Sequence, residues 1–122
     1  MIIVWVKDLF FGSKIEAEAR AHHASCCFAD THQNVLSSVQ NNASSLMLVD
    51  LQASNKVLDT IRIIKSNPAS SHMRIIGFLS HVEADLAQKA QVAGCDVVMP
   101  RSLFAKSLPE IFNKHREMVA AV

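Results

Sequence analysis

The sequence predicts a doubly wound α/β fold, in which a parallel β-sheet carries helices on both of its faces. Short apolar runs alternate five times with longer segments of helical periodicity. The apolar runs are nearly continuous, as is typical of strands buried on both faces of a parallel sheet. The chain has 122 residues, of which 50% are hydrophobic, and this is enough for one domain with its own core. We therefore expect a single domain over residues 1–122.

The boundaries of the elements follow from start and stop signals in the sequence. Ser54 can cap the third helix, Asn67–Pro68 can end it, and Gly94 can end the fourth. Ser80–Glu83 and Ser107–Glu110 have the spacing of a capping box and are expected to open the fourth and fifth helices. The expected strands are residues 2–6, 25–29, 45–50, 74–79 and 96–99. The expected helices are approximately residues 12–23, 32–42, 55–66, 82–93 and 108–120.

The composition excludes several classes of protein. The net charge is +1 with dispersed Lys and Arg residues, which argues against a nucleic-acid partner. The N-terminal apolar run is too short for a signal peptide, and no run approaches the roughly 20 apolar residues of a membrane span. Cys26, Cys27 and Cys95 make an odd number, which favours reduced thiols, the first two in a buried strand. We therefore expect a cytoplasmic protein with no membrane partner.

Charged and polar residues follow four of the five predicted strands. Asp50 closes the third strand, and Lys7 with Asp8 follows the first. Ser80 follows the fourth strand and Arg101 the fifth. Ligands of open parallel sheets bind outside the carboxyl ends of the strands. We therefore expect Asp50, Asp8, Ser80 and Arg101 to converge at one edge of the sheet.

With these residues the chain resembles a response-regulator receiver domain of two-component signalling, over essentially its whole length. The resemblance implies a flavodoxin-like sheet with the strand order 2-1-3-4-5. It also implies that Asp50 is the phospho-acceptor and that Ser80 and Arg101 contact the phosphoryl group. A weakly bound Mg²⁺ would be held by Asp8, Asp50 and the backbone carbonyl of Gln52. No other cofactor is implied.

Three positions depart from the receiver pattern. Lys7 replaces one acid of the usual acidic pair, so the site loses an oxygen ligand and gains a cation beside the metal position. Arg101 replaces the usual lysine, although an alignment shifted by one residue would place Met99 there instead. Val98 stands where receivers often carry an aromatic residue that reorients on activation. The chain is therefore expected to be a degenerate, pseudo-receiver-like variant.

Three functions are compatible with this sequence. The first is a non-enzymatic protein–protein interaction module with weakened or lost aspartyl phosphorylation, whose partner is a histidine kinase, a downstream target or a second copy. The alternative is a competent receiver that is phosphorylated on Asp50 with Mg²⁺. The third is a small enzyme or nucleotide binder, although the chain has only 3 glycines and lacks a phosphate-cradling glycine motif.

Two apolar segments are candidates for a partner surface. Leu9–Phe11 follows the acidic position, and Leu103–Phe104 precedes the expected start of the fifth helix. Large apolar side chains in loops can anchor a partner, whereas burial within the domain is the alternative. The candidate anchors are Phe10, Phe11, Leu103 and Phe104. The apolar stripe expected on the fifth helix, which faces the core, consists of Leu108, Ile111, Phe112, His115 and Val119.

Overall fold

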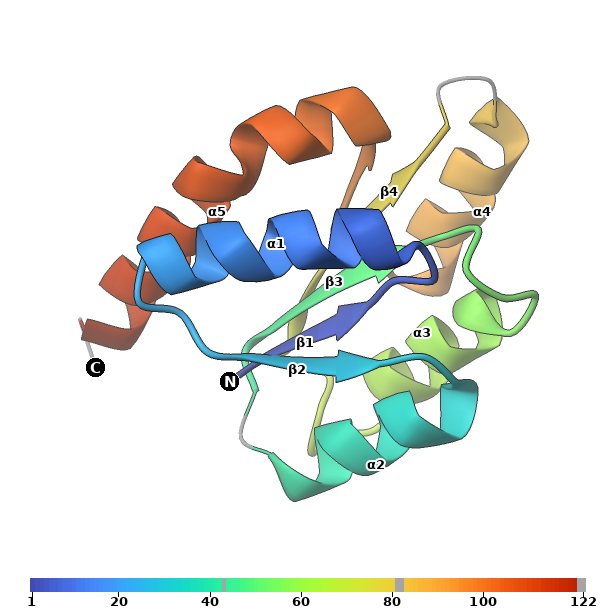
Figure 1. Ribbon diagram of the computed structural model, residues 1–122. Helices are drawn as coiled ribbons and strands as arrows, with labels where there is room; N and C mark the ends of the chain where they lie inside the picture. The colour runs from blue at the N-terminus through green and yellow to red at the C-terminus, as the bar shows by residue number, and fades with distance from the viewer. Residues whose placement is uncertain (43, 81–82, 121–122) are drawn as a thin grey trace.

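Strands and helices alternate along the chain in the computed structural model (Figure 1). The structure describes residues 1–42, 44–80 and 83–120, and the side chains of these residues as far as Arg116. The strands are β1 (Ile2–Trp5), β2 (Cys26–Ala29), β3 (Leu46–Asp50), β4 (Arg74–Leu79) and β5 (Val97–Pro100). The helices are α1 (Leu9–Ala21), α2 (His32–Asn41), α3 (Val57–Ser66), α4 (Ala84–Ala93) and α5 (Arg101–Ala120).

The strands form one parallel sheet in the order β2-β1-β3-β4-β5. The register pairs Asp50 of β3 with Phe78 of β4, and Leu79 of β4 with Pro100 of β5. The strands therefore end nearly level with one another, so the residues that follow them lie at the same edge of the sheet. This topology confirms the predicted fold class and strand order.

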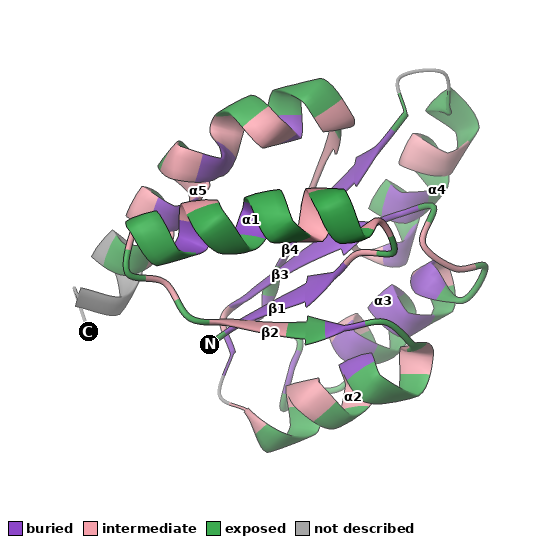
Figure 2. Ribbon diagram, viewed as in Figure 1, coloured by how far each residue is buried: buried purple, intermediate pink, exposed green. Residues whose placement is uncertain are grey.

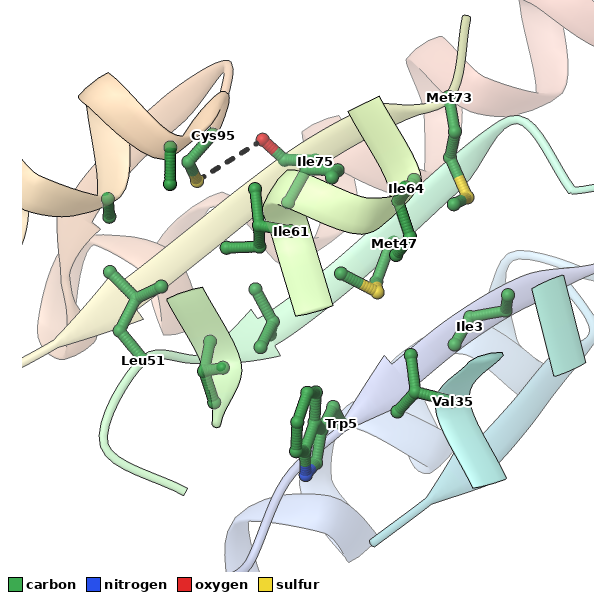
Figure 3. Close-up of a cluster of buried hydrophobic side chains, with 14 of the residues drawn as sticks. Ile3, Trp5, Val35, Met47, Leu51, Ile61, Ile64, Met73, Ile75 and Cys95 are labelled. Carbon is green, nitrogen blue, oxygen red and sulfur yellow. Dashed lines mark hydrogen bonds between the residues drawn. The ribbon is translucent and has the colours of Figure 1, made fainter. Parts of the chain in front are cut away.

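Helices cover both faces of the sheet, as predicted. α1 and α5 lie on one face, and α2, α3 and α4 lie on the other (Figure 1). Side chains alternate between the faces, because successive strand residues point in opposite directions. In β1, Ile2 and Val4 face α1 and α5, whereas Ile3 and Trp5 face the other helices (Figure 3). β1, β3 and β4 are therefore buried along nearly their whole length (Figure 2).

β2 is an edge strand, and the prediction that it is buried was wrong. Cys26 and Cys27 are only half-buried, and Phe28 is exposed (Figure 2). A five-stranded open sheet has two edges, and a strand at an edge has a neighbour on one side only. Burial raises the pKa of Cys26 and of the fully buried Cys95 to about 11, so both thiols are protonated at neutral pH.

α1 begins at Leu9 rather than at residue 12. Asp8 is its N-cap, and Asp8 Oδ1 accepts hydrogen bonds from the backbone N–H groups of Phe10 (2.9 Å) and Phe11 (3.3 Å). Aspartate is among the best N-capping residues because its carboxylate satisfies N–H groups that have no partner within the helix. Leu9–Phe11 is therefore the first turn of a helix and not a loop.

α5 begins at Arg101 rather than at residue 108. Phe104, Leu108 and Phe112 are all fully buried against the sheet, and this spacing of four residues sets the inner face of the helix. Ser107–Glu110 is consequently not a capping box, and Pro109 lies inside the helix. Leu103 and Phe104 are helical as well. His115 and Ile111 of the predicted stripe are half-buried, and the side chain of Val119 lies outside the described residues.

The predicted boundaries of α3 and α4 are correct at their ends and wrong at their starts. α3 ends before Asn67, and α4 ends at Gly94, which has a φ of +121°. Ser54 accepts a hydrogen bond from the backbone of Lys56 (3.1 Å) in the turn before α3, but it does not cap the helix. α4 begins at Ala84, so Ser80 does not cap it, and residues 81–82 of that predicted capping box lie outside the described residues.

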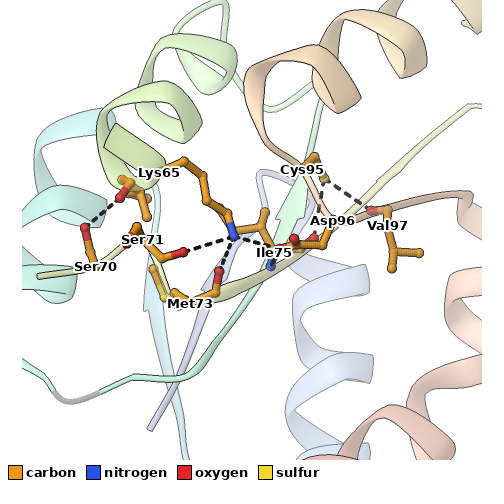
Figure 4. A network of polar contacts seen from close by, with 9 residues as sticks. Lys65, Ser70, Ser71, Met73, Ile75, Cys95, Asp96 and Val97 are labelled. Carbon is orange, nitrogen blue, oxygen red and sulfur yellow. Dashed lines mark hydrogen bonds and ion pairs between the residues drawn. The ribbon is translucent and has the colours of Figure 1, made fainter. Parts of the chain in front are cut away.

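A half-buried lysine joins the elements at the amino ends of the strands, the edge of the sheet opposite Asp50 (Figure 4). Lys65 Nζ, from α3, donates to the carbonyl of Met73 (2.6 Å) and to Asp96 Oδ2 (2.9 Å). Asp96 Oδ2 also accepts the backbone N–H of Ile75 (2.7 Å). These contacts tie α3 to the amino ends of β4 and β5. The charged residues that follow the strands lie at the other side of the sheet, at the carboxyl ends.

Candidate functional site

Three charged side chains meet at the carboxyl edge of the sheet. Asp50 is the last residue of β3, Asp8 follows β1, and Arg101 is the first residue of α5. One guanidinium nitrogen of Arg101 lies 3.5 Å from Asp8 Oδ2, and the other lies 3.8 Å from Asp50 Oδ2. The Asp50 side chain is only 9% exposed, whereas that of Arg101 is 43% exposed. A single guanidinium therefore spans two carboxylates, one of which is buried.

The guanidinium of Arg101 also lies over aromatic rings, which sequence reasoning did not anticipate. Its central carbon is 4.5 Å from the ring centre of Phe11 and 5.9 Å from that of Phe78. Phe78 stacks in turn on Phe104, with ring centres 4.3 Å apart. Cation–π contacts of this kind are worth about 0.5–1 kcal/mol at exposed sites and about 2 kcal/mol when desolvated. The rings hold Arg101 against the two carboxylates.

All four oxygens of the two carboxylates face donors within the protein. Asp8 Oδ1 accepts the N–H groups of the first turn of α1, and Asp8 Oδ2 faces Arg101. Asp50 Oδ1 accepts the backbone N–H of Gln52 (2.9 Å), and Asp50 Oδ2 faces Arg101. Each carboxylate therefore has partners within the chain, although the Asp8 side chain is still 41% exposed and only that of Asp50 is buried.

Ser80 lies at the same edge and is linked to Asp50 by hydrogen bonds through Gln52. The backbone N–H of Ser80 donates to the side-chain oxygen of Gln52 (3.1 Å), and the backbone N–H of Gln52 donates to Asp50. Both Ser80 and Gln52 are exposed. The structure thus brings Asp8, Asp50, Ser80 and Arg101 together, with Gln52 as the link between two of them.

Lys7, Met99 and Val98 do not take part in this cluster. Lys7 is exposed and forms no ion pair with any residue in the described part of the chain. Met99 is half-buried and packs in the core on the α5 side, and Val98 packs in the core on the opposite face. Of the two positions considered for the cation, Arg101 reaches the carboxylates and Met99 does not.

The residues at this edge do not fit a receiver-type Mg²⁺ site. Mg²⁺ needs near-octahedral coordination by oxygen atoms, usually with carboxylates among them. Here Asp8 Oδ1 and Asp50 Oδ1 already accept backbone N–H groups, and the guanidinium of Arg101 lies 3.5 and 3.8 Å from their other oxygens. Lys7, next to Asp8 in the sequence, offers no side-chain oxygen. Among residues 1–42, 44–80 and 83–120, no three His, Cys, Asp or Glu side chains are grouped to hold a metal ion.

Two of the four predicted partner-surface residues are exposed. Phe10 is 91% exposed and its neighbour Leu9 is 85% exposed, both in the first turn of α1. Leu103, in the first turn of α5, is 50% exposed. Phe104 is fully buried and Phe11 lies half-buried beneath Arg101, so the predicted surface role of Phe104 is wrong.

None of the described helices is long and apolar enough to span a membrane.

The arrangement of strands and helices closely matches solved structures of one class of signalling domain. It superposes on the chemotaxis response regulator CheY4 of Vibrio cholerae with a TM-score of 0.80, at 7% identity, over 93% of this chain and 95% of that chain. The fold is that of receiver domains. A response regulator from Hahella chejuensis gives a TM-score of 0.79 at 21% identity, covering 92% of this chain and 91% of that one. A response regulator from Thermotoga maritima gives 0.77 at 16% identity, covering 93% of both chains.

These similarities concern the receiver fold alone, because the identities are low. No protein-family model matches the sequence, and no curated protein matches it significantly. In this fold Asp50 ends the third strand, and the structure places Arg101 beside it.

Proposed function

We propose that the chain is a receiver-like signalling domain that acts as a non-enzymatic protein–protein interaction module without aspartyl phosphorylation. The observation that carries this proposal is the guanidinium of Arg101, which lies between Asp8 and Asp50 at 3.5 and 3.8 Å. Aspartyl phosphorylation requires a carboxylate nucleophile and a divalent cation that neutralises the transferring phosphoryl group. In this domain a side chain of the protein supplies the positive charge at that place.

Phosphorylation of Asp50 would require several contacts to break together. Arg101 would have to leave Asp50, Asp8 and the ring of Phe11 before a metal ion could approach both carboxylates. Arginine remains charged at every accessible pH, so the guanidinium cannot be neutralised to release these contacts. The alternative function, a competent phospho-acceptor, draws support from Asp50 itself, which ends β3 beside a cation and near Ser80.

The interaction surface in this proposal is the apolar patch of Leu9, Phe10 and Leu103. These side chains belong to the first turns of α1 and α5, and the two helices pack side by side (Figure 1). Asp8 caps α1 and Arg101 opens α5, so the ion pair between them holds the two turns that carry the patch. The partner is a kinase, a downstream signalling protein or a second copy of the chain.

The proposal is tested by incubating the protein with acetyl phosphate and Mg²⁺ and measuring the mass of the intact chain. The wild type is expected to gain no phosphoryl group. The double variant Lys7→Asp/Arg101→Lys restores the acidic pair and the compact ammonium group, and it is expected to gain one. Adding Asp50→Asn to the double variant should abolish this gain, because the acceptor carboxylate is then absent.

Stoichiometric labelling of the wild type that is lost in Asp50→Asn would contradict the proposal. It would establish the competent phospho-acceptor in its place. Labelling that survives Asp50→Asn would be modification at another residue, so the single variant is an essential control.

A further inference from the structure

A groove of about 640 Å³ lies between α5 and the sheet, away from the charged edge. It is lined by the starts of β3, β4 and β5 and by the middle turns of α5, which runs back along this face of the sheet (Figure 1). Small-molecule sites in proteins typically have volumes of about 300–1,000 Å³. The groove is large enough for one small ligand.

The floor of the groove is apolar. Leu46 and Ile76 come from β3 and β4, Val97 and Met99 come from β5, and Ile111 comes from α5. Leu46 and Ile76 are almost fully buried, whereas the other three are half-buried and line the open side of the groove. An apolar molecule lying here would remove their remaining exposed surface from water, which favours binding.

Among the described residues, the charged side chains at the mouth of the groove have a net positive charge. Lys114 is paired with Glu110 at 3.0 Å, so these two charges offset each other. Burial lowers the pKa of His115, which lies 3.5 Å from the Ser45 hydroxyl and is neutral at neutral pH. Arg74 is exposed at the start of β4 and forms no ion pair with any residue in the described part of the chain.

We propose that this groove binds a small anionic amphiphile, whose apolar body lies on the floor and whose anionic head pairs with Arg74. The groove thus combines an apolar floor with exposed charged side chains from β4 and α5. An apolar body supplies most of the affinity, and the exposed guanidinium of Arg74 selects a carboxylate or sulfonate head over a neutral or cationic one. This site is separate from the Asp50 cluster and does not depend on the proposed function.

The test uses anilinonaphthalene sulfonate, an aromatic anion whose fluorescence rises in apolar sites, as the probe of the folded wild-type protein. Saturable binding is expected, and decanoate should displace the probe better than decanol or decyltrimethylammonium. Arg74→Gln should weaken the binding of decanoate about fivefold, as expected for the loss of one exposed ion pair. It should leave the binding of decanol unchanged. Arg62→Gln removes an exposed arginine of α3 that does not line the groove, and it is the matched control. It should change neither the affinity for decanoate nor that for decanol.

A second variant tests the floor independently of the charge. Val97→Trp fills the groove from β5, and it should abolish saturable probe binding while the near-native unfolding midpoint shows that the protein is folded. The proposal is overturned if the wild type shows no saturable binding, if decanol binds as well as decanoate, or if Arg74→Gln and Arg62→Gln behave alike. It is also overturned if probe binding is lost as protein concentration rises and the mass by light scattering doubles, because a second copy would then occupy the groove.

Discussion

Arg101 stands at an unusual place for a cation. As the first residue of α5 it lies at the positive end of the helix dipole, where a positive charge is unfavourable. The two carboxylates and the ring of Phe11 offset this, and Asp50 in turn gains a counter-charge for a side chain that is 9% exposed. Burying a carboxylate without a partner is costly, so Arg101 and Asp50 depend on each other.

Asp8 has two separate structural roles, and its replacement should be measurably destabilising. Asp8→Ala removes the N-cap of α1 and one partner of Arg101. The free energy of unfolding in urea is expected to fall by about 0.5–2 kcal/mol, the usual effect of losing a cap. Asp59→Ala, which removes an exposed ion pair with Arg62 and an acid from the first turn of α3 but no cap, should lower it by about 0.2–0.5 kcal/mol. Equal losses in the two variants would mean that Asp8 contributes nothing as a cap.

His115 makes stability depend on pH. Burial, and to a smaller extent the charge of the amino terminus, lowers the pKa of His115 below its ordinary value of 6.5. The unfolded chain therefore binds more protons than the folded protein near pH 6, so the free energy of unfolding decreases as pH falls below 6.5 toward the folded pKa. Above pH 6.5 this contribution is constant.

Unfolding curves of the wild type and His115→Gln between pH 8 and pH 5 check this prediction. The variant should lose less stability than the wild type as the pH falls, because it has no imidazole to protonate. His72→Gln, at an exposed histidine, is the control. A steeper pH dependence in His115→Gln than in the wild type would contradict the assigned direction.

At the scale of the element, the two glycines at helix positions should respond in opposite ways to alanine. Gly94 ends α4 with a φ of +121°, and a Cβ there would lie 2.7 Å from Lys65 Cγ. Gly94→Ala should therefore cost about 1–3 kcal/mol, through backbone strain and displacement of Lys65 from Asp96. Gly12 lies inside α1, where a Cβ would make ordinary contacts at 3.6 Å or more, so Gly12→Ala should stabilise by about 0.5–1 kcal/mol.

Thermal and urea unfolding of both glycine variants provide the measurement. A stabilising Gly94→Ala would show that the end of α4 tolerates a side chain. It would also mean that the contact between α4 and Lys65 is looser than the structure has it.

The sequence predicted the elements well and their starting points poorly. Strands that are buried on both faces are nearly continuous apolar runs, so β1, β3 and β4 were found within one or two residues. Ser107–Glu110 has a capping spacing inside α5, and only the buried face formed by Phe104, Leu108 and Phe112 shows that the helix begins earlier. A local capping signal competes with the burial of apolar side chains in setting where a helix begins. At α5, the burial of Phe104 favours a start before the capping signal at Ser107.

For the candidate site, the sequence predicted which strand-end residues meet but missed a contact that depends on where α1 begins. Asp50, Asp8 and Arg101 were predicted to converge because the carboxyl ends of parallel strands share an edge. The position of Phe11 beneath Arg101 was missed, because residues 9–11 were assigned to a loop. With α1 starting at Leu9, Phe11 falls one turn before Ile15 and faces inward, so the Asp8 capping signal could have revealed it.

At the scale of the whole molecule, surface and core phenylalanines should contribute very differently to stability. Phe10 is 91% exposed and Phe104 is fully buried against Phe78. Phe104→Ala should lower the free energy of unfolding by about 3–5 kcal/mol, whereas Phe10→Ala should change it by less than about 0.5 kcal/mol. A large loss in Phe10→Ala would show that Phe10 packs within the domain, and the apolar patch would then lack its principal anchor.

We propose that Arg101 takes the place at the carboxyl edge that a divalent cation would occupy in a phosphorylated receiver. The most direct measurement is a Mg²⁺ titration of the wild type, followed by the amide NMR signals of Gln52 and Arg101. No saturable shift is predicted at millimolar Mg²⁺, while Lys7→Asp/Arg101→Ala should show one, because it supplies an acid and removes the competing guanidinium. Saturable shifts in the wild type that disappear in Asp50→Asn would contradict the account.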